Sequence, residues 1–340
     1  MELNKETKMK KILFLCTFLC WTACPVNADF TTAESYFSNK DYSRAFSEFL
    51  PLANEGDFRS QYYIGYLYLN GLGVTQDVKE AVRFLTLASQ QNYDMAQSLL
   101  AFLYDEGQAV PQNKEKAIEL YLKAAEQNNS SANLNLGVMY YNGTNVEKDH
   151  AKALEYFKKV PVEEKPVVAR YIGDILLNNV QLKNYPEALH YYSLAAKAGD
   201  LDAYFALGEI YRRGLGVSKS ITAALPYYQY AASKGYAPAQ YMLGIIYVNG
   251  EGVVRNLPKG YAWLTLASEQ RFINAEKALD QLSGSMSIAD FDQSRREITQ
   301  IQENEIGKIN PPIIAEKTLK PIIKKSTKNN RTKRRRRSSR

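Results

Sequence analysis

The chain contains 340 residues, with 43 Lys and Arg, 36 Asp and Glu, three Cys and a formal charge of +7. Hydrophobic residues make up 45% of it, which is typical of a globular protein and excludes a collagen, a polytopic membrane protein and a wholly disordered chain. Residues 1–28 carry a charge of +2, residues 29–302 carry −5 and residues 303–340 carry +10. The body of the protein is therefore mildly acidic, and the basic character belongs to a C-terminal tail.

Residues 1–28 have the pattern of a secretory signal peptide. Lys8, Lys10 and Lys11 precede the apolar run 12–21, and Ala28 is a small residue at the expected cleavage site. This run is too short to span a bilayer of ~30 Å, which makes a permanent membrane helix the weaker interpretation. Met9 is an alternative start. We predict export to the periplasm or cell envelope, or secretion, with a mature chain that begins at residue 29.

All three cysteines lie within the predicted signal peptide, at Cys16, Cys20 and Cys24, the last of which fits a lipidation motif poorly. The mature chain would contain none. It therefore has no residue for disulfide bonds, thiol catalysis or Cys-based zinc sites.

Residues 29–272 contain one unit that is repeated about seven times. A residue that can cap a helix N-terminus recurs every 36 residues, with one step of 35: Asp41, Asp77, Asn113, Asp149, Asn184, Ser220 and Asn256. A small residue recurs in the same register upstream, at Gly65, Ala101, Gly137, Gly173, Gly208 and Gly244. Each unit is predicted to be a helical hairpin whose second helix begins at the capping residue. Asp77 and Glu80 also have the spacing of a capping box.

Apolar residues at helical spacing predict the core of each hairpin. For example, Ile64 and Leu67 share one face of a first helix, and Phe84 and Leu85 share one face of the second. The glycine of the first helix, here Gly65, costs ~1 kcal/mol of helix propensity relative to Ala. We therefore expect the partner helix to approach closely at this glycine.

The signature Ala-x-x-x-Leu-Gly-x-x-Tyr-x-x-Gly-x-Gly-Val is complete at residues 203–217 and 239–253. It closely resembles the SEL-one-like repeat, a branch of the tetratricopeptide-like α/α solenoids. The resemblance covers roughly residues 30–272 and implies an all-α, right-handed superhelix of about seven hairpins. The unit at 30–58 lacks the Gly-x-Gly-Val turn, and the unit at 162–199 has a loop one residue short, so we expect irregular packing there. Residues 273–302 predict C-terminal capping helices, and residues 303–340 a disordered basic tail.

No pattern in the chain predicts catalysis. The mature chain has two histidines, and we interpret His190 as a half-buried structural residue and His150 as an exposed residue of a first helical turn. The Gly-rich turns lack the spacing and the lysine of a phosphate-binding loop. We predict no catalytic residue, no metal site, no cofactor and no small-molecule substrate.

A stacked array of hairpins offers a long concave surface to a protein or peptide. Candidate partner-binding residues lie on the first helices, outside the core stripe: Tyr62, Tyr66, Phe102, Tyr141, Arg170, Asp174, Phe205, Glu209, Arg212 and Tyr241. Exposed Tyr and Arg are enriched at binding hot spots, although aromatic residues at helical spacing are more often part of a core.

The basic tail supplies a second set of candidates, for contact with anionic lipid, lipopolysaccharide or nucleic acid: Lys324, Lys325, Lys333, Arg334, Arg335, Arg336 and Arg337. A solvated tail without such a role and a nuclear-localisation signal are the alternatives.

We expect an exported bacterial scaffold or adaptor that binds other proteins and is not an enzyme. The family resemblance implies envelope, motility, signalling or host-interaction roles without choosing among them. A secreted virulence factor that engages host proteins is the alternative. Penicillin-binding or β-lactamase-like activity is a weaker alternative, because the relatives linked to it carry paired cysteines that this mature chain lacks.

Overall fold

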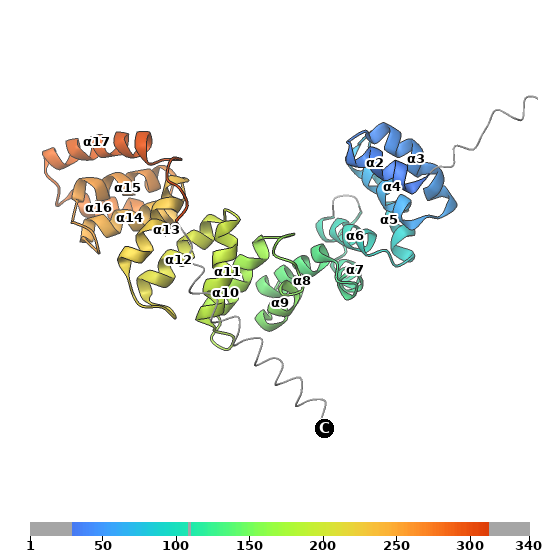
Figure 1. Cartoon of the computed structure of the whole chain (residues 1–340), viewed down its shortest axis with the longest axis horizontal. Coiled ribbons are helices and arrows are strands. Elements are labelled where there is room, and N and C mark those ends of the chain that lie inside the picture. The colour runs from blue at the N-terminus through green and yellow to red at the C-terminus, as the bar shows by residue number, and fades with distance from the viewer. Residues whose placement is uncertain (1–28, 108–109, 313–340) are drawn as a thin grey trace, which may run out of the picture. The chain divides into compact units, whose positions relative to one another are not determined.

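The computed structural model describes residues 29–107 and 110–312, which form sixteen α-helices and no strand (Figure 1). Fourteen of the helices pair as seven hairpins: α2 (Phe30–Ser38) with α3 (Tyr42–Glu55), α4 (Phe58–Asn70) with α5 (Val78–Gln90), α6 (Asp94–Glu106) with α7 (Lys114–Glu126), α8 (Ser130–Asn142) with α9 (His150–Phe157), α10 (Val167–Asn178) with α11 (Tyr185–Lys197), α12 (Leu201–Arg213) with α13 (Ile221–Ser233), and α14 (Ala237–Asn249) with α15 (Leu257–Glu269). The even-numbered helix is the first of each hairpin.

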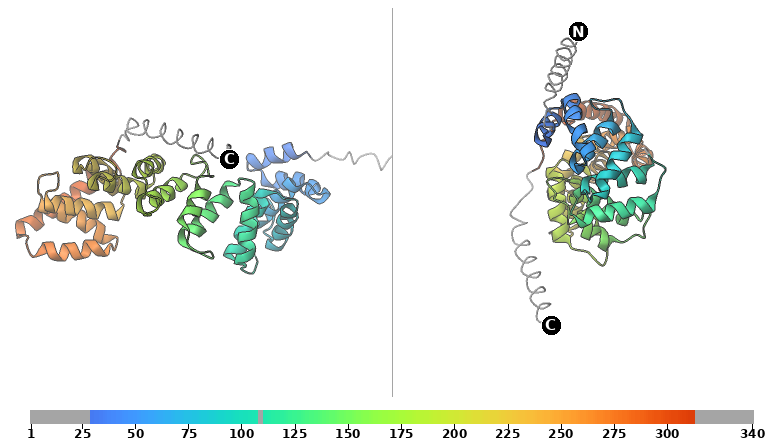
Figure 2. Two further views of the ribbon diagram at one scale, coloured as in Figure 1. Left: turned by 90° about the horizontal axis from the view of Figure 1, so that it is seen from below. Right: turned by 90° about the vertical axis from the view of Figure 1, so that its right-hand side faces the viewer.

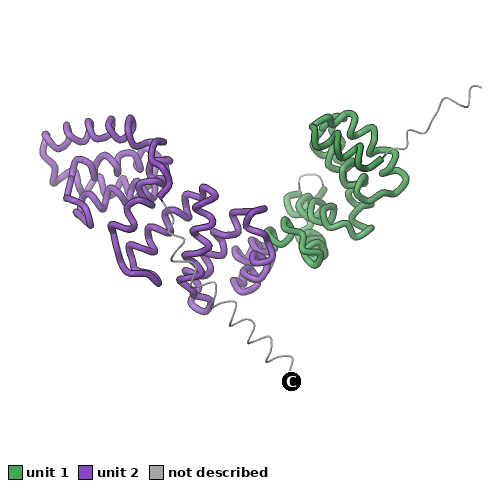
Figure 3. Tube along the Cα trace, viewed as in Figure 1, with its two compact units in different colours: residues 1–136 green, residues 137–340 purple. Residues whose placement is uncertain are grey.

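The chain divides into two compact units, residues 1–136 and residues 137–340, coloured green and purple in Figure 3. Within each unit a helix packs against the partner of its own hairpin and against the neighbouring hairpin, as the views of Figure 2 also show. The result is the predicted all-α solenoid of helical hairpins.

The second helices begin where the capping residues predict. The side chain of each of the seven capping residues accepts a hydrogen bond from a backbone N–H of the first turn of its helix. The 36-residue spacing is therefore the register of the fold. The capping box expected at Asp77 and Glu80 does not form, because the Glu80 carboxylate instead accepts hydrogen bonds from Arg83 at 2.9 and 2.8 Å. A complete box is found at Ser287 and Asp290.

The glycines of the first helices permit the predicted close approach. A Cβ atom at Gly65 would lie 2.7 Å from Leu85 Cγ, and the equivalent atom at Gly208 would lie 2.5 Å from the Tyr228 ring. Real Cβ atoms do not approach carbon this closely, because the contact is repulsive. The helix propensity lost at these glycines is thus offset by tight packing of the second helix.

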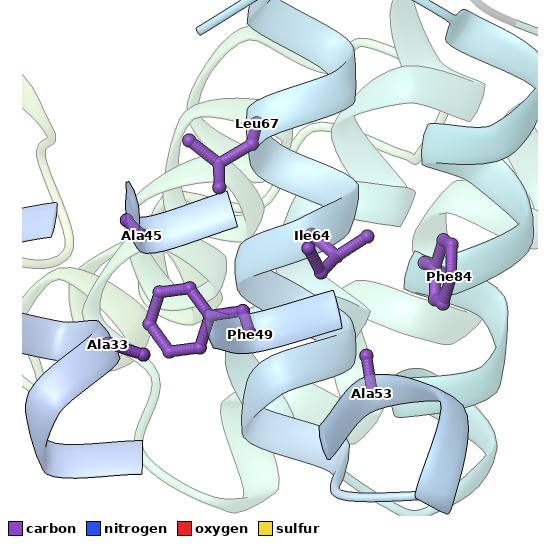
Figure 4. Packing of buried hydrophobic residues seen from close by; sticks show 7 residues of the cluster. All are labelled: Ala33, Ala45, Phe49, Ala53, Ile64, Leu67 and Phe84. Carbon is purple, nitrogen blue, oxygen red and sulfur yellow. The ribbon is translucent and has the colours of Figure 1, made fainter. Parts of the chain in front are cut away.

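The N-terminal hairpin forms although it lacks the Gly-x-Gly-Val turn. Ala33 of α2 and Phe49 of α3 are buried against Ile64 and Leu67 of α4, and Figure 4 shows these side chains converging. The Phe49 ring also stacks on Tyr63 with centroids 4.6 Å apart. Apolar and aromatic contacts hold this hairpin in the array.

The irregular unit predicted after residue 161 is visible in the structure. The preceding helix α9 has eight residues rather than thirteen, and α10 begins only at Val167. Helix α10 ends at Asn179 in extended backbone rather than at a left-handed glycine. The Asn179 side chain accepts hydrogen bonds from the backbone of Gln181 and Leu182, at 3.0 and 3.1 Å. This Asn-based turn replaces the longer glycine loop of the other units.

Two helices follow the last hairpin, as predicted: α16 (Ile273–Ser283) and α17 (Ile288–Asn304). The predicted boundary at residue 302 falls inside α17. A turn then packs on unit 2, where Glu305 lies 3.0 Å from Lys259 Nζ and Gly307 N–H donates to the Ser233 carbonyl at 2.6 Å. Among the described helices, none combines the length and the apolar composition that a membrane crossing requires. The predicted signal peptide and most of the tail lie outside the described residues.

Candidate functional site

All ten candidate partner-binding residues lie on first helices. Unit 1 holds Tyr62 and Tyr66 on α4 and Phe102 on α6, whereas unit 2 holds Tyr141 on α8, Arg170 and Asp174 on α10, Phe205, Glu209 and Arg212 on α12, and Tyr241 on α14. None of them is fully buried. The basic candidates of the tail, residues 324–337, lie outside the described residues, so their contact with anionic partners stays a prediction.

Two candidates of unit 1, Tyr62 and Tyr66, belong to a larger group of aromatic rings, and the third, Phe102, lies on the next first helix, α6. The Tyr62 ring centroid lies 6.4 Å from that of Tyr66 and 5.6 Å from that of Tyr93, and Phe58 lies 5.1 Å from Tyr93. Phe58 and Phe102 leave 36% and 41% of their surface exposed. We call Phe58, Tyr62, Tyr66, Tyr93 and Phe102 the aromatic face of unit 1. Sequence reasoning missed Phe58 and Tyr93 because they stand at helix N-termini, outside the positions that were counted from the glycine.

One contact recurs between neighbouring hairpins. The residue three before the helical glycine touches the N-cap residue of the next first helix. The ring pairs are Tyr62–Tyr93 at 5.6 Å, Phe205–Tyr236 at 5.9 Å and Tyr241–Phe272 at 5.5 Å. At the same position Arg170 Nε donates to Asp200 at 3.0 Å. Part of each of these candidate side chains therefore joins repeats, and only the remainder is accessible to a partner.

Arg170 lies among three carboxylates in unit 2. Its guanidinium is 3.0 Å from Asp200, 3.5 Å from Asp174 and 4.0 Å from Asp202. The Tyr192 hydroxyl donates to Asp174 Oδ1 at 2.6 Å. Burial raises the pKa of Asp174, and the opposing effects of Tyr192 and Arg170 are too small to cancel it. Asp174 is thus a carboxylate whose negative charge is only partly compensated.

The equivalent residue one repeat later, Glu209, has the opposite balance. It accepts two hydrogen bonds from Arg212, at 2.8 and 2.7 Å, and one from the Tyr228 hydroxyl at 2.6 Å. Burial acts to raise the pKa of Glu209, but the hydrogen bonds from Arg212 and Tyr228 outweigh it and hold the pKa below its ordinary value. Glu209 and Arg212 therefore satisfy one another before any partner binds.

Asp174 and Glu209 also serve the packing of their own hairpins. Each follows a helical glycine, and each accepts from a tyrosine whose ring lies against that glycine, Tyr192 on Gly173 and Tyr228 on Gly208. Where an apolar residue lies on the glycine, the next residue is not an acid. Leu85 lies on Gly65, Phe157 on Gly137 and Leu264 on Gly244. The residues that follow these glycines are Tyr66, Val138 and Ile245. An acid after the helical glycine and a tyrosine 18 or 19 residues later form a sequence pattern that indicates this hydrogen bond.

The prediction that His150 is exposed was wrong, although it lies in the first turn of α9 as predicted, and the prediction for His190 is confirmed. His150 is half-buried because its ring stacks on Tyr141 at 5.3 Å and its Nδ1 lies 3.0 Å from Asn179 Nδ2. His190 is half-buried, and burial lowers its pKa. Across residues 29–107 and 110–312, no three His, Cys, Asp or Glu side chains are grouped so that they could hold a metal ion.

The repeat geometry agrees with a family comparison. Six segments match the Sel1 repeat, at residues 59–93, 94–129, 130–159, 179–200, 201–236 and 237–272, which is more than half of the chain. The chain belongs to the Sel1 repeat family. This is the family whose signature the sequence resembles. The hairpin α2/α3 and residues 160–178 lie outside the matched segments, in agreement with their departures from the signature.

Solved Sel1 repeat structures share the fold. A protective antigen present in uropathogenic Escherichia coli strains is similar with a TM-score of 0.70 and 26% identity, over 82% of this chain and 65% of that chain. The present chain thus spans less than two thirds of that protein. A Sel1 repeat protein from Oxalobacter formigenes has a TM-score of 0.59 and 27% identity, over 71% of this chain and 97% of that chain. A comparison with curated proteins found no match.

Proposed function

We propose that the chain is an exported, non-catalytic scaffold that binds peptide or protein partners along the first helices of its repeats. The observation that carries this proposal is the aromatic face of unit 1, where Phe58 exposes 36% of its surface beside the half-buried Tyr93 and Phe102 of α6 exposes 41%. Aromatic side chains of this kind dominate the energetics of binding surfaces. Membership of the Sel1 repeat family supports the proposal, since such repeats generally mediate protein interactions.

Unit 2 contributes a charged surface to the same function. The Asp202 side chain is 57% exposed beside Arg170, and Arg212 is 29% exposed beside Glu209. These partly exposed ion pairs can exchange one partner for a group on a bound protein, which favours specificity and fast association more than raw affinity.

The capture of partners by the mature chain tests the binding surface. We expect Tyr66→Ala combined with Phe102→Ala to lose partners that the parent chain enriches, because two aromatic anchors are removed. Leu122→Ala is the matched control, since Leu122 is 36% exposed but lies on α7, a second helix. Equal enrichment by all three proteins would show that the first helices of unit 1 are not the binding surface.

We further propose that residues 1–28 direct export and are removed. Asp29, the first residue of the predicted mature chain, caps α2 by accepting a hydrogen bond on its side chain from Thr31 N–H. Mass spectrometry of the protein from cells that produce the full chain is expected to find Asp29 at the N-terminus, outside the cytoplasm. An intact N-terminus in the cytoplasmic fraction would contradict this proposal.

A secreted factor that engages host proteins is the second candidate function. It is supported by the likeness to the protective antigen of uropathogenic Escherichia coli. Parallel capture from bacterial envelope extract and from host-cell extract separates the two candidates, with the Tyr66→Ala/Phe102→Ala variant as the specificity control in both. We expect no hydrolysis of a β-lactam such as nitrocefin, and a clear turnover would overturn the non-catalytic assignment.

A further inference from the structure

His150 and Asn179 join two neighbouring hairpins in the irregular part of unit 2. His150 lies in the first turn of α9, and Asn179 is the C-cap residue of α10, which belongs to the next hairpin. Their side chains meet with His150 Nδ1 at 3.0 Å from Asn179 Nδ2. Because this contact crosses from one hairpin to the next, its state affects how the two hairpins are held together.

The orientation of the Asn179 amide is fixed by the turn that it closes. Its Oδ1 accepts hydrogen bonds from the backbone N–H groups of Gln181 and Leu182, at 3.0 and 3.1 Å. If the amide oxygen and nitrogen were exchanged, an NH2 group would face these two N–H donors, so the hydrogen-bond network assigns the amide. Asn179 therefore turns its Nδ2, which can only donate, toward His150.

This orientation determines which nitrogen of His150 carries the proton. Nδ1 accepts the hydrogen bond from Asn179 Nδ2, so the ring is neutral and its one proton is on Nε2. Nε2 is buried and has no hydrogen-bond partner among the residues that the structure describes. After uptake of a second proton, Nδ1–H would face the Asn179 NH2 group and Nε2–H would still lack an acceptor. The contact therefore cannot form around a charged imidazolium.

The charged groups around this contact come in pairs of opposite sign. Lys148 and Asp149 line a cavity of about 350 Å³ together with the two side chains, and this cavity gives water access to them. Tyr141 of α8 stacks on the imidazole with ring centroids 5.3 Å apart. Arg170 and Asp174 of α10 act in opposite directions on the pKa of Tyr141. Hydrogen-bond geometry, rather than a local charge of one sign, therefore governs the contact.

We propose that His150 and Asn179 form a pH-sensitive latch between the fourth and fifth hairpins, closed while the imidazole is neutral and open once it is protonated. Histidine ordinarily changes its charge between about pH 5 and pH 8, so the latch closes toward the upper end of this range and opens toward the lower end. Opening separates the Asn179 turn from α9 and frees one face of the Tyr141 ring. The latch can be tested without any partner, so this inference does not depend on the proposed function.

Nitrogen-15 NMR of the imidazole rings in the mature chain tests the closed latch directly. The chain contains two histidines, and the spectrum of His190→Gln identifies the signals of His150 by elimination. At pH 8 we expect the proton of His150 on Nε2 and an unprotonated Nδ1. A ring whose proton lies on Nδ1 at pH 8 would overturn the inference, because it could not accept from Asn179.

Asn179→Asp reverses the chemistry of the latch. One carboxylate oxygen can still accept from Gln181 and Leu182, while the other can accept from a protonated His150 Nδ1. The pH at which His150 takes up its second proton is therefore expected to rise by at least ~1 unit relative to the parent chain. Asn178→Asp is the matched control, since it adds the same charge at the exposed neighbouring position. Equal rises in the two variants would show a general effect of charge and no latch.

The backbone amide signals of Gln181 and Leu182 report on the open state. In the parent chain we expect them to shift between pH 8 and pH 5 together with the His150 ring. His150→Phe keeps a ring beside Tyr141 but cannot take up a proton, so these signals should stay constant and lie close to those of the parent chain at pH 5. A shift in His150→Phe as large as that in the parent would contradict the latch. Circular dichroism checks that each variant remains helical, and the proton position at pH 8 tests the latch even where a variant does not fold.

Discussion

The Tyr228 hydroxyl donates a hydrogen bond of 2.6 Å to the Glu209 carboxylate, across the two helices of one hairpin. The Tyr228 ring fills the space in which a Cβ atom at Gly208 would lie. The same arrangement joins Tyr192, Asp174 and Gly173 one repeat earlier. The tyrosine that packs against the helical glycine therefore also holds the carboxylate beside it by a hydrogen bond. This arrangement fixes the side chains of Glu209 and Asp174, which the sequence alone indicates as candidates for binding.

Gly208→Ala is predicted to destabilise the protein, although Ala is the better helix former by ~1 kcal/mol. The new Cβ would lie 2.5 Å from the Tyr228 ring, and overpacking of this kind costs about 1–3 kcal/mol. Gly284→Ala is the matched control, because its backbone is right-handed helical and no atom lies within 4 Å of the added carbon. Thermal unfolding of both variants should show a lower midpoint for Gly208→Ala only.

Glu209 and Asp174 are predicted to make opposite contributions to the pH dependence of stability. The pKa of Glu209 is lowered in the folded state, so its stabilising contribution is present above its ordinary value of 4.5 and is lost as the pH falls through the folded pKa. Glu209→Gln should therefore destabilise the protein at pH 7, with a deficit that shrinks in acid.

The pKa of Asp174 is raised in the folded state, so this group costs stability at pH 7 and the cost disappears as the pH falls through the raised pKa toward 3.8. The difference in free energy of unfolding between Asp174→Asn and the parent protein should therefore favour the variant more at pH 7 than in acid. Urea unfolding of both variants between pH 3 and pH 7 measures the two trends. Parallel curves for the two variants would contradict the assigned pKa directions.

The seven capping residues and their 36-residue register follow from the sequence, because a cap depends on one side chain and its own helix. The second helices Val78–Gln90, Ile221–Ser233 and Leu257–Glu269 therefore begin where Asp77, Ser220 and Asn256 predict. The close approach at Gly65 and Gly208 could also be predicted, since a helix tolerates glycine poorly without a packing reason.

The environment of the site residues could not be predicted in the same way. The placing of Asp174 and Glu209 beneath tyrosines depends on contact between two helices. His150 contacts Asn179, which belongs to the irregular loop of the next hairpin. Tyr93 joins the aromatic face because one hairpin stacks on the next. Such contacts combine residues about 20 to 30 positions apart, which helical periodicity within one element does not reveal.

Paired glutamines join neighbouring second helices through a first helix. Gln270 Nε2 donates to Gln240 Oε1 at 2.7 Å, and Gln240 Nε2 donates to the Ala232 carbonyl at 3.2 Å. Gln240 is buried, so Gln240→Leu should destabilise the protein by about 1 kcal/mol, because its two hydrogen bonds are lost while the Ala232 carbonyl keeps the Gly235 N–H as a donor. A double-mutant cycle with Gln270→Ala should give a coupling of about 1 kcal/mol, and additive effects would show that the pair contributes nothing.

Arg271→Gly is predicted to stabilise the protein. Arg271 follows the C-cap residue of α15 with a φ of 61°, in the left-handed region, whereas Gly235 fills the equivalent position after α13 with a φ of 82°. A non-glycine residue in this region costs about 1 kcal/mol, so removal of the side chain should raise the unfolding midpoint. Gly235→Ala is the reciprocal test and should lower the midpoint, since no atom within 4 Å hinders its Cβ and only backbone strain acts.

Hydrogen–deuterium exchange of the mature chain with and without a captured partner tests the central claim most directly, because it reports on every helix at once. The account predicts added protection in the first helices α4, α6, α10 and α12, and little change in the second helices α5, α7, α11 and α13 outside their ends. Protection concentrated on the second helices, with α4 and α6 unchanged, would contradict the assignment of the first-helix surface as the site of binding.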